Sequence, residues 1–292
     1  MKTIRRADAR SDSVGAAKMT LDVTFDSNVW ECIVDPEKRD AHADANALNR
    51  IRSAIESGVV RPFISDVVVT LEGVRRRDRA SVFRDIEISS TSTHSVAPPS
   101  PDGPATVSRT ITRRTSFDHF PSAHEKLSRS LHEAVTLGFK MIRVPPIGWM
   151  RLEEAWYKPT PADEGQLSDL LHRTNVAAVS FEEQGCGVAW VTELGEEALR
   201  IHPELTQRGI QSPFLAFAYG DNQAAIPDAV AEWADGDALA AHYGHGHDVF
   251  CSLDRGRQAG SRSILQGSRR TWLMREFGIK VSSPIELSEL FS

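Results

Sequence analysis

The clearest sequence signal for the fold is residues 21–30, LDVTFDSNVW, where a short apolar run is followed directly by polar residues. Leu21, Val23 and Phe25 alternate with polar residues, and the run stops at Asp26. A period of two is typical of a half-buried β-strand, and the polar residues that follow favour a turn or the start of a helix. We therefore expect a strand here with an acidic side chain at its carboxyl end.

Further strand and helix signals alternate along the rest of the chain. Apolar residues at helical spacing, stopped by glycines such as Gly58 and Gly278, indicate helices, and compact apolar runs between them indicate strands. This alternation predicts an α/β fold with a mostly parallel central sheet flanked by helices. The expected strands are 59–65, 140–145, 248–254 and 279–281, and the expected helices are 44–57, 66–77, 123–139, 228–243, 269–278 and 283–291, with further helical segments in 165–200.

Composition places the chain among globular proteins. Its 292 residues are 40% hydrophobic and 25% charged, enough for a buried core in one large or two small domains. It has no apolar run long enough for a transmembrane helix and no apolar stretch in its first twenty residues, so we expect neither a membrane span nor a secretory signal. Three cysteines are too few for a disulfide framework and indicate reduced thiols in the cytoplasm. The net charge of −6 argues against a globally basic nucleic-acid binder.

Two segments depart from the alternating pattern. Residues 1–18 are polar and without periodicity, which predicts a mobile leader. The stretch from about 90 to 122 is rich in Ser, Thr and Pro and has few large apolar residues, so we expect a flexible loop or linker there.

Four acidic residues stand next to apolar neighbours. Asp26 and Asp254 follow predicted strands, and Glu72 and Asp237 lie on predicted helices. A lone ionised carboxylate is costly in an apolar setting, and a divalent cation shared by several carboxylates removes that cost. Each acid taken singly is more simply explained as a helix cap or a surface acid, and it is the four together that favour a metal site.

The contexts of these acids resemble the motifs of PIN-domain nucleases, a family of metal-dependent enzymes. The opening FDSNVW is similar to the family's first acidic motif, with Ser27 at the hydroxyl position after Asp26. The other similar segments, in order, are PFISDVVVTLEGV with Glu72, GDALAAH with Asp237, DVFCSLDRG with Asp254, and the ending GIKVSSPIEL.

The resemblance covers about 21–90 and 226–292. It implies a PIN-like nuclease domain made of 19–90 and 226–292, with 91–225 as a large central insertion or a helical extension of the fold. The third acid is ambiguous, because Asp235 and Asp237 project about 200° apart on a helix and only one of them can face a site. We select Asp237 because it precedes the small apolar run ALAA.

The resemblance implies an endoribonuclease with a Mg²⁺ or Mn²⁺ centre. Asp26, Asp237 and Asp254 would bind the metal, and Glu72 would bind it directly or through water, or orient the attacking water. Ser27 would hold a ligand or a phosphate by hydrogen bonding. RNA is the implied substrate, and an antitoxin-like protein inhibitor is a possible partner because the family includes toxins of bacterial toxin–antitoxin pairs.

Two basic tracts follow the proposed site acids. Residues 255–275 hold six arginines and no acid, and 75–79 read RRRDR. Arginine suits bidentate phosphate contact, although a solvated basic face is the plainer interpretation of either tract. The expected contacts with nucleic acid are Arg75, Arg76, Arg255, Arg257 and Arg262.

Three alternatives stay open at the level of sequence. The chain could be a non-catalytic RNA-binding or regulatory module that keeps the PIN fold. It could also be a receiver-like phosphate-handling domain, although the only other acid of the first strand, Asp22, is four residues from Asp26. The histidines of HYGHGHDVFC, residues 242–251, suggest zinc, but their spacing is loose and structural or surface roles are expected.

Overall fold

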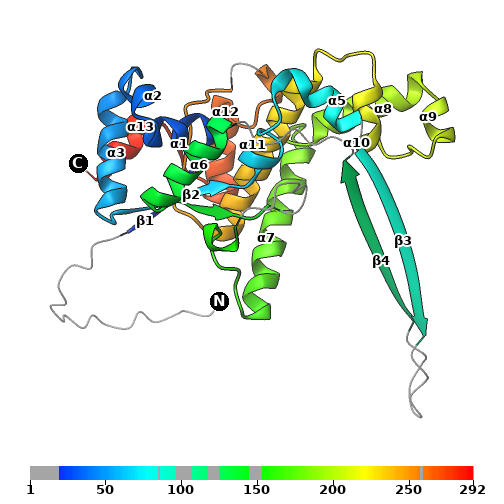
Figure 1. Cartoon of the computed structure of the whole chain (residues 1–292), viewed down its shortest axis with the longest axis horizontal. Coiled ribbons are helices and arrows are strands. Elements are labelled where there is room, and N and C mark those ends of the chain that lie inside the picture. Colours follow the sequence, from blue (N-terminus) through cyan, green and yellow to red (C-terminus); the bar gives the residue numbers. More distant parts are fainter. Residues whose placement is uncertain are drawn as a thin grey trace, which may run out of the picture.

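The computed structural model describes residues 20–84, 86–96, 107–117, 125–144, 153–256 and 259–291, and the expected leader lies outside them. Its centre is a sheet of five strands, all parallel, which confirms the α/β class and the parallel sheet (Figure 1). In spatial order the strands are β5 (Lys140–Ile142), β2 (Val60–Ser65), β1 (Leu21–Phe25), β6 (Val249–Cys251) and β7 (Val281–Ser282).

The alternation seen in residues 21–25 separates the two faces of the sheet. Phe25 pairs in register with Ile64 and Cys251, and all three are buried in one core. Thr24 points to the opposite face, which is also where Phe250 is buried. Because successive side chains of a strand point to opposite faces, a one-residue shift in register would exchange these two cores.

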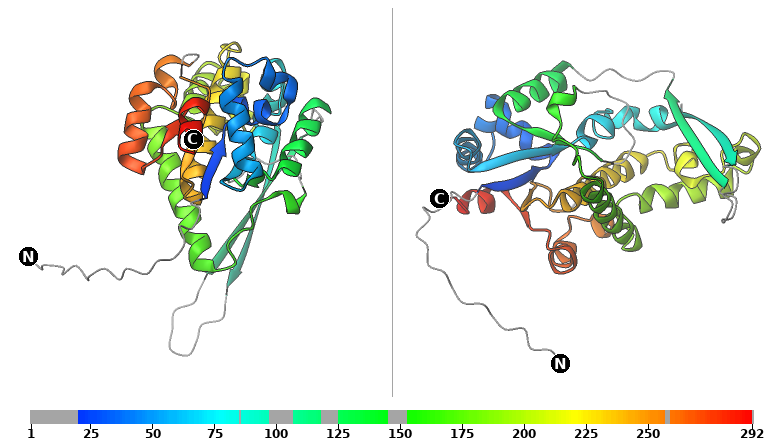
Figure 2. Two further views of the ribbon diagram at one scale, coloured as in Figure 1. Left: turned by 90° about the vertical axis from the view of Figure 1, so that its left-hand side faces the viewer. Right: turned by 90° about the horizontal axis from the view of Figure 1, so that it is seen from below.

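Helices cover both faces (Figures 1 and 2). The Phe25 face is packed by helices from both ends of the chain, and α11 lies against the other face with further helices around it. The first group is α1 (Ser27–Val34), α3 (Ala45–Glu56), α6 (Glu125–Leu137) and α13 (Pro284–Glu289), and the second is α11 (Ile226–His245), α7 (Glu164–Glu183), α8 (Ala189–Ile201) and α12 (Gly267–Phe277).

Described parts of the segment 91–225 belong to the sheet and its core. Its strand β5 pairs with β2 and forms one edge, and Phe181 of α7 is buried in the core around α11. The shorter elements of the fold are α2 (Pro36–Asp40), α4 (Val67–Thr70), η1 (Arg76–Asp78), α5 (Arg79–Arg84), η2 (Glu154–Trp156), α9 (Glu204–Gln207), α10 (Pro213–Ala216), η3 (Phe217–Tyr219) and η4 (Gly260–Arg262).

The Ser/Thr-rich stretch contains regular structure, so the expectation of a loop is wrong for much of it. The strands β3 (Ile86–Val96) and β4 (Val107–Phe117) pair antiparallel and extend away from the rest of the molecule in Figure 1. Threonine, isoleucine and valine recur along both strands, and β-branched residues favour strands even where few large apolar groups are present. The rest of that expected loop, 97–106 and 118–122, lies outside the described residues.

The single helix expected over 66–77 is also wrong. The structure has the short α4, then a turn, then η1 and α5. Three valines and a threonine make up α4, and β-branched side chains lose rotamer freedom in a helix. The result places Glu72 in a turn instead of on a continuous helix.

None of the described helices combines the length and the apolar composition that crossing a bilayer requires.

The position of α11 depends on a close approach of two glycines, which gives a test of this packing. A Cβ on Gly236 would lie 2.8 Å from the Cα of Gly187, whereas a Cβ on Gly267 would meet nothing within 4 Å. We expect Gly236→Ala to lower the free energy of unfolding by about 1–3 kcal/mol despite the better helix propensity of alanine. Gly267→Ala is the matched control and should be neutral or stabilising by up to about 1 kcal/mol. Urea denaturation measures both, and equal effects would contradict the close packing.

Candidate active site

A pocket of about 530 Å³ opens at the carboxyl ends of β1 and β6. The order of the strands reverses between these two, since β1 is followed in the chain by β2 on its other side. Ligands of open parallel sheets bind at such reversal points. The pocket is lined by Asp26, Ser27, Asn28, Glu72, Ala231, Asp235, Leu253, Asp254 and Arg255.

Asp26 lies at the bottom of this pocket and is 7% exposed. It is the N-cap of α1, and its Oδ1 accepts a hydrogen bond of 2.6 Å from the Ser27 backbone N–H. Its Oδ2 accepts hydrogen bonds from Asn28 Nδ2 at 2.8 Å and from Ser252 Oγ at 2.5 Å. Burial, with a smaller contribution from the charge of Asp254, raises the pKa of Asp26, and these hydrogen bonds oppose the shift.

Glu72 reaches the same pocket from the turn after α4. Its Oε1 accepts a hydrogen bond of 3.1 Å from Ser27 Oγ. Burial and then the negative charge of Asp26 raise the pKa of Glu72 to about 7, while the guanidinium of Arg79 lowers it. Arg79 is itself buried and donates to the carbonyl oxygen of Pro227 at 2.7 Å. Glu72 therefore exchanges a proton near neutral pH.

Asp254 lies in a loop held rigid by its own hydrogen bonds. Its backbone N–H donates to Ser252 Oγ at 2.9 Å, and its Oδ1 accepts from the Gly256 N–H at 2.7 Å. Gly256 has a φ of +67°, and a Cβ there would lie 2.5 Å from the backbone nitrogen of Gln266. Asn28 joins this loop to α1, because its Oδ1 accepts from the Leu253 N–H at 2.9 Å.

The third acid of the pocket is Asp235, and the selection of Asp237 is corrected. Asp235 lines the pocket, and burial and then the charge of Asp26 raise its pKa well above the usual range. Asp237 instead accepts a hydrogen bond from the side chain of Trp233 and lies near Glu182 of α7. Burial raises the pKa of Asp237 to about 7. Ala238, Leu239 and Ala240, directly after Asp237, are buried in the core, whereas Asp235 lines the pocket.

Two polar residues of the pocket region were not singled out from the sequence. Asn28 and Ser252 both donate to Asp26, and each also contacts the loop that carries Asp254. Asn28 stands in the FDSNVW motif, so a signal was present for it. Ser252 has no comparable signal, because its role depends on the pairing of β1 with β6.

Arg255 and Arg262, both in the basic tract after Asp254, have different surroundings. Arg255 is exposed and lines the pocket, as expected for contact with a phosphate. Arg262 instead pairs with Glu193 at 2.5 Å and lies over the ring of Trp190 at 5.2 Å, so its expected role in nucleic-acid contact is not supported by its position. Arg257 lies outside the described residues.

The tract at 75–79 divides in the same way. Arg75 is exposed, whereas Arg76 forms an ion pair with Asp228 at the start of α11. Both lie close in sequence to Glu72, and Arg76 has a protein partner that a phosphate would have to displace. The position of Arg75 remains compatible with contact to nucleic acid.

The histidines near the end of α11 form a structural network. Thr24 Oγ1 lies 2.9 Å from His242 Nδ1 and 2.8 Å from His247 Nδ1, and His247 Nε2 lies 3.0 Å from Lys158 Nζ. Burial lowers the pKa of His242 to about 3 and that of His245 to about 4. These contacts join the end of α11 to Thr24, on the face of the sheet opposite Phe25, in agreement with a structural role.

The acidic pocket has the donor chemistry of a site for a hard cation. Carboxylates, the hydroxyl of Ser27 and the amide of Asn28 meet in an open pocket, and oxygen donors of this kind suit Mg²⁺ and Mn²⁺. As the side chains stand, no group of three or more His, Cys, Asp or Glu residues in the described part of the chain is arranged to hold a metal ion. Burial, and to a smaller extent the charge of neighbouring carboxylates, raises the pKa of Asp26, Glu72 and Asp235, and a bound cation would favour their ionised forms.

Comparison of the chain with protein families, with curated proteins and with solved structures finds no match in any of the three.

The pKa of Glu72 predicts how the stability of the metal-free protein depends on pH. Its pKa rises from 4.5 to about 7 on folding, so between these values the native state binds a proton that the unfolded state has released. Stability should therefore fall as pH rises from about 4.5 to 7, by at most about 3 kcal/mol for this group. Glu72→Gln should flatten that fall, and Glu133→Gln, at an exposed position of α6, should not. Urea denaturation in EDTA at several pH values measures this, and parallel curves for parent and Glu72→Gln would refute it.

Proposed function

We propose that this protein is a metal-dependent nuclease of the PIN type that hydrolyses phosphodiester bonds of RNA. One observation carries the proposal: Asp26, Glu72, Asp235 and Asp254 line a single open pocket at the reversal point of a parallel sheet. Burial and mutual repulsion raise the pKa of three of them, so the arrangement is unfavourable without a counter-charge. Such unfavourable clusters of titratable groups are typical of functional sites.

Asp26, Asp235 and Asp254 are the proposed ligands of Mg²⁺ or Mn²⁺. A divalent cation bound there would lower the pKa of a water molecule and offset the charge of the scissile phosphate. Ser27 links Asp26 to Glu72 through its backbone N–H and its hydroxyl, which orients both carboxylates. Glu72, with a pKa of about 7, can accept or return a proton near neutral pH, directly or through water.

The pocket suits a polyanionic strand more than a small neutral substrate. It is open and lined mainly by polar groups, and Arg255 stands at its rim with Arg75 exposed near Glu72. Arginine binds phosphate through two parallel N–H donors. The proposal also includes RNA as the substrate and an antitoxin-like protein as an inhibitor, both from the resemblance to PIN-domain nucleases. It places the protein in the cytoplasm because of its cysteine content.

A non-catalytic RNA-binding module is the second candidate. It takes support from the separation of the acids, which are not arranged to hold a metal ion as they stand. The receiver-like alternative requires a second acid beside Asp26, and Asp22 is instead bound by Arg61 Nη2 at 2.8 Å. Incubation of the protein with mixed RNA and single-stranded DNA in Mg²⁺, Mn²⁺ or EDTA separates the two candidates, because only an enzyme cleaves in a metal-dependent way.

The two neighbouring acids of α11 allow a matched comparison of activity. Asp235→Asn removes a charge from the pocket and should reduce RNA cleavage by orders of magnitude. Asp237→Asn changes the same residue type two positions away and keeps an oxygen that can accept from Trp233, so cleavage should be unchanged. Initial rates in Mn²⁺ measure both. Equal rates for parent and Asp235→Asn would remove Asp235 from the site.

Metal binding also predicts a change in stability that does not depend on turnover. A ligand that binds only the folded state stabilises it by RT ln(1 + [L]/Kd), about 2.7 kcal/mol at a hundredfold excess over Kd. Mn²⁺ should therefore raise the melting temperature of the parent and of Asp237→Asn, and raise that of Asp235→Asn much less. Without metal, Asp235→Asn should melt at or above the parent temperature, because repulsion with Asp26 is relieved. A parent whose melting is insensitive to Mg²⁺ and Mn²⁺ would contradict the metal site.

A further inference from the structure

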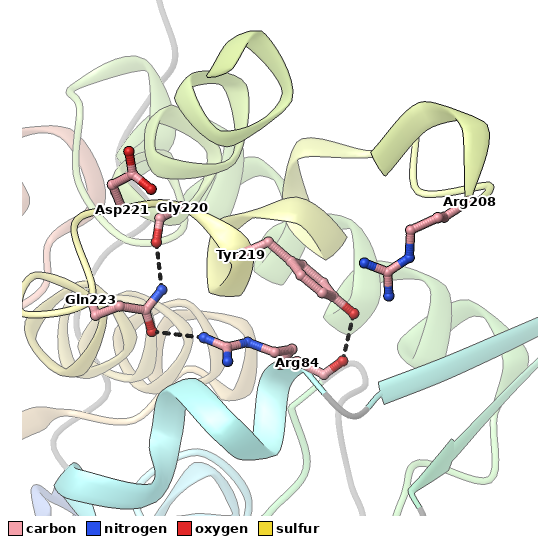
Figure 3. A pocket seen from close by; sticks show the side chains of 6 residues that line it. All are labelled: Arg84, Arg208, Tyr219, Gly220, Asp221 and Gln223. Carbon is pink, nitrogen blue, oxygen red and sulfur yellow. Dashed lines mark hydrogen bonds between the residues drawn. The ribbon is translucent and has the colours of Figure 1, made fainter. Parts of the chain in front are cut away.

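A second open pocket, of about 640 Å³, lies where α5 meets the turn after η3 (Figure 3). Its lining consists of polar, charged and aromatic groups, with no aliphatic side chain other than the stems of its arginines. The residues are Arg84, Arg208, Tyr219, Gly220, Asp221 and Gln223.

The centre of this pocket is Tyr219, whose ring is held by neighbouring groups. Its hydroxyl donates to the backbone oxygen of Arg84 at 2.7 Å. The guanidinium of Arg84 in turn donates to the backbone oxygen of Ala218 at 3.2 Å and to Gln223 Oε1 at 3.1 Å. Figure 3 shows Gln223 and the Arg84 guanidinium joined below the ring. Tyr219 therefore offers an aromatic ring at a fixed position.

Arg208, the residue directly after α9, approaches the same ring and is far less constrained. Its guanidinium carbon lies 5.3 Å from the centre of the Tyr219 ring, and the residue is exposed. Within the described part of the chain, no hydrogen bond or ion pair fixes this guanidinium. The acid of the pocket lining, Asp221, lies 3.2 Å from His202 Nε2. Arg208 thus keeps its N–H donors available for an anionic ligand beside an aromatic surface.

A basic segment connects this pocket with the acidic pocket. Residues 75–84 contain five arginines and one acid, and they are tied to the start of α11 through Arg76 and Arg79. Along α11, Asp235 lies nine residues after Ile226, a rise of about 14 Å at 1.5 Å per residue, and Gln223 of the Tyr219 pocket precedes Ile226 by three residues. A single strand of several nucleotides would therefore be needed to reach from one pocket to the other.

We propose that the Tyr219 pocket binds a base and a phosphate of a single-stranded nucleic acid whose scissile bond lies in the acidic pocket. Bases of single strands stack on aromatic rings and on arginine planes, whereas bases of a duplex are not available for such stacking. Arg208 would contact the phosphate, and the exposed Arg75 and Arg77 would contact the strand between the pockets. This inference rests on the proposed nuclease function, because it assigns a substrate subsite to that enzyme.

Binding of a labelled single-stranded oligoribonucleotide of roughly ten nucleotides tests the subsite, within the site sizes known for such surfaces. Fluorescence anisotropy on the full chain in EDTA measures Kd without cleavage. Tyr219→Leu should weaken binding about 5- to 100-fold, because a stacked base is lost, while Tyr219→Phe keeps the ring and should bind as the parent does. Arg208→Gln should reduce the slope of log K against log salt by about 0.7, and Arg50→Gln, at an exposed position of α3, should leave it unchanged.

Arg208→Gln keeps the test valid if Tyr219→Leu fails to fold, since Arg208 is exposed. The subsite would be overturned if Arg208→Gln and a folded Tyr219→Leu kept the Kd and the salt slope of the parent. It would also be overturned if the parent bound a perfect RNA duplex as tightly as the single strand. Cleavage by the parent in Mn²⁺ separates the two proposals. A parent that cleaves while the variants bind normally leaves the nuclease function standing without the subsite. If the variants bind the oligoribonucleotide more weakly than the parent but the parent never cleaves RNA, the subsite stands and the nuclease function is refuted.

Discussion

The burial of Asp26 is the constraint on which the rest of the pocket depends. Its carboxylate accepts from the backbone of Ser27, from Asn28 and from Ser252, which come from α1 and from the end of β6. A buried carboxylate without these donors would be too costly to maintain. The same donors also position their neighbours, because Asn28 binds the Leu253 N–H and Ser252 binds the Asp254 N–H. The loop with Asp254 is therefore arranged around Asp26.

The remaining acids add repulsion that the protein only partly relieves. Arg79 lowers the pKa of Glu72, yet burial and the charge of Asp26 still hold it near 7. Asp235 receives similar repulsion from Asp26 on a helix that is packed too closely at Gly236 to move away. The folded chain thus keeps several carboxyl groups in a state that added positive charge would stabilise.

The arginines illustrate how position decides the use of a side chain. Arg255 and Arg262 are seven residues apart in one basic tract, yet one is exposed at the pocket and the other is paired with Glu193 over Trp190. Arg84 and Arg208 lie far apart in the sequence, yet both lie by the ring of Tyr219. Charge density along the chain therefore does not identify the surface that would bind nucleic acid.

The alternation of residues 21–25 was sufficient to predict the first strand, because periodicity is a local property. The succession of strand and helix signals along the whole chain was sufficient to predict the α/β class and the parallel sheet. The resemblance to PIN-domain motifs grouped Asp26, Glu72 and Asp254, and all three line one pocket. The choice between Asp235 and Asp237 depended on which face of α11 packs against α7 and the sheet, a contact between residues distant in sequence. The role of Ser252, the place of β5 at the edge of the sheet and the pocket at Tyr219 likewise come from such pairings. A side chain's type is written in the sequence, but its neighbours are set by the packing of the whole chain.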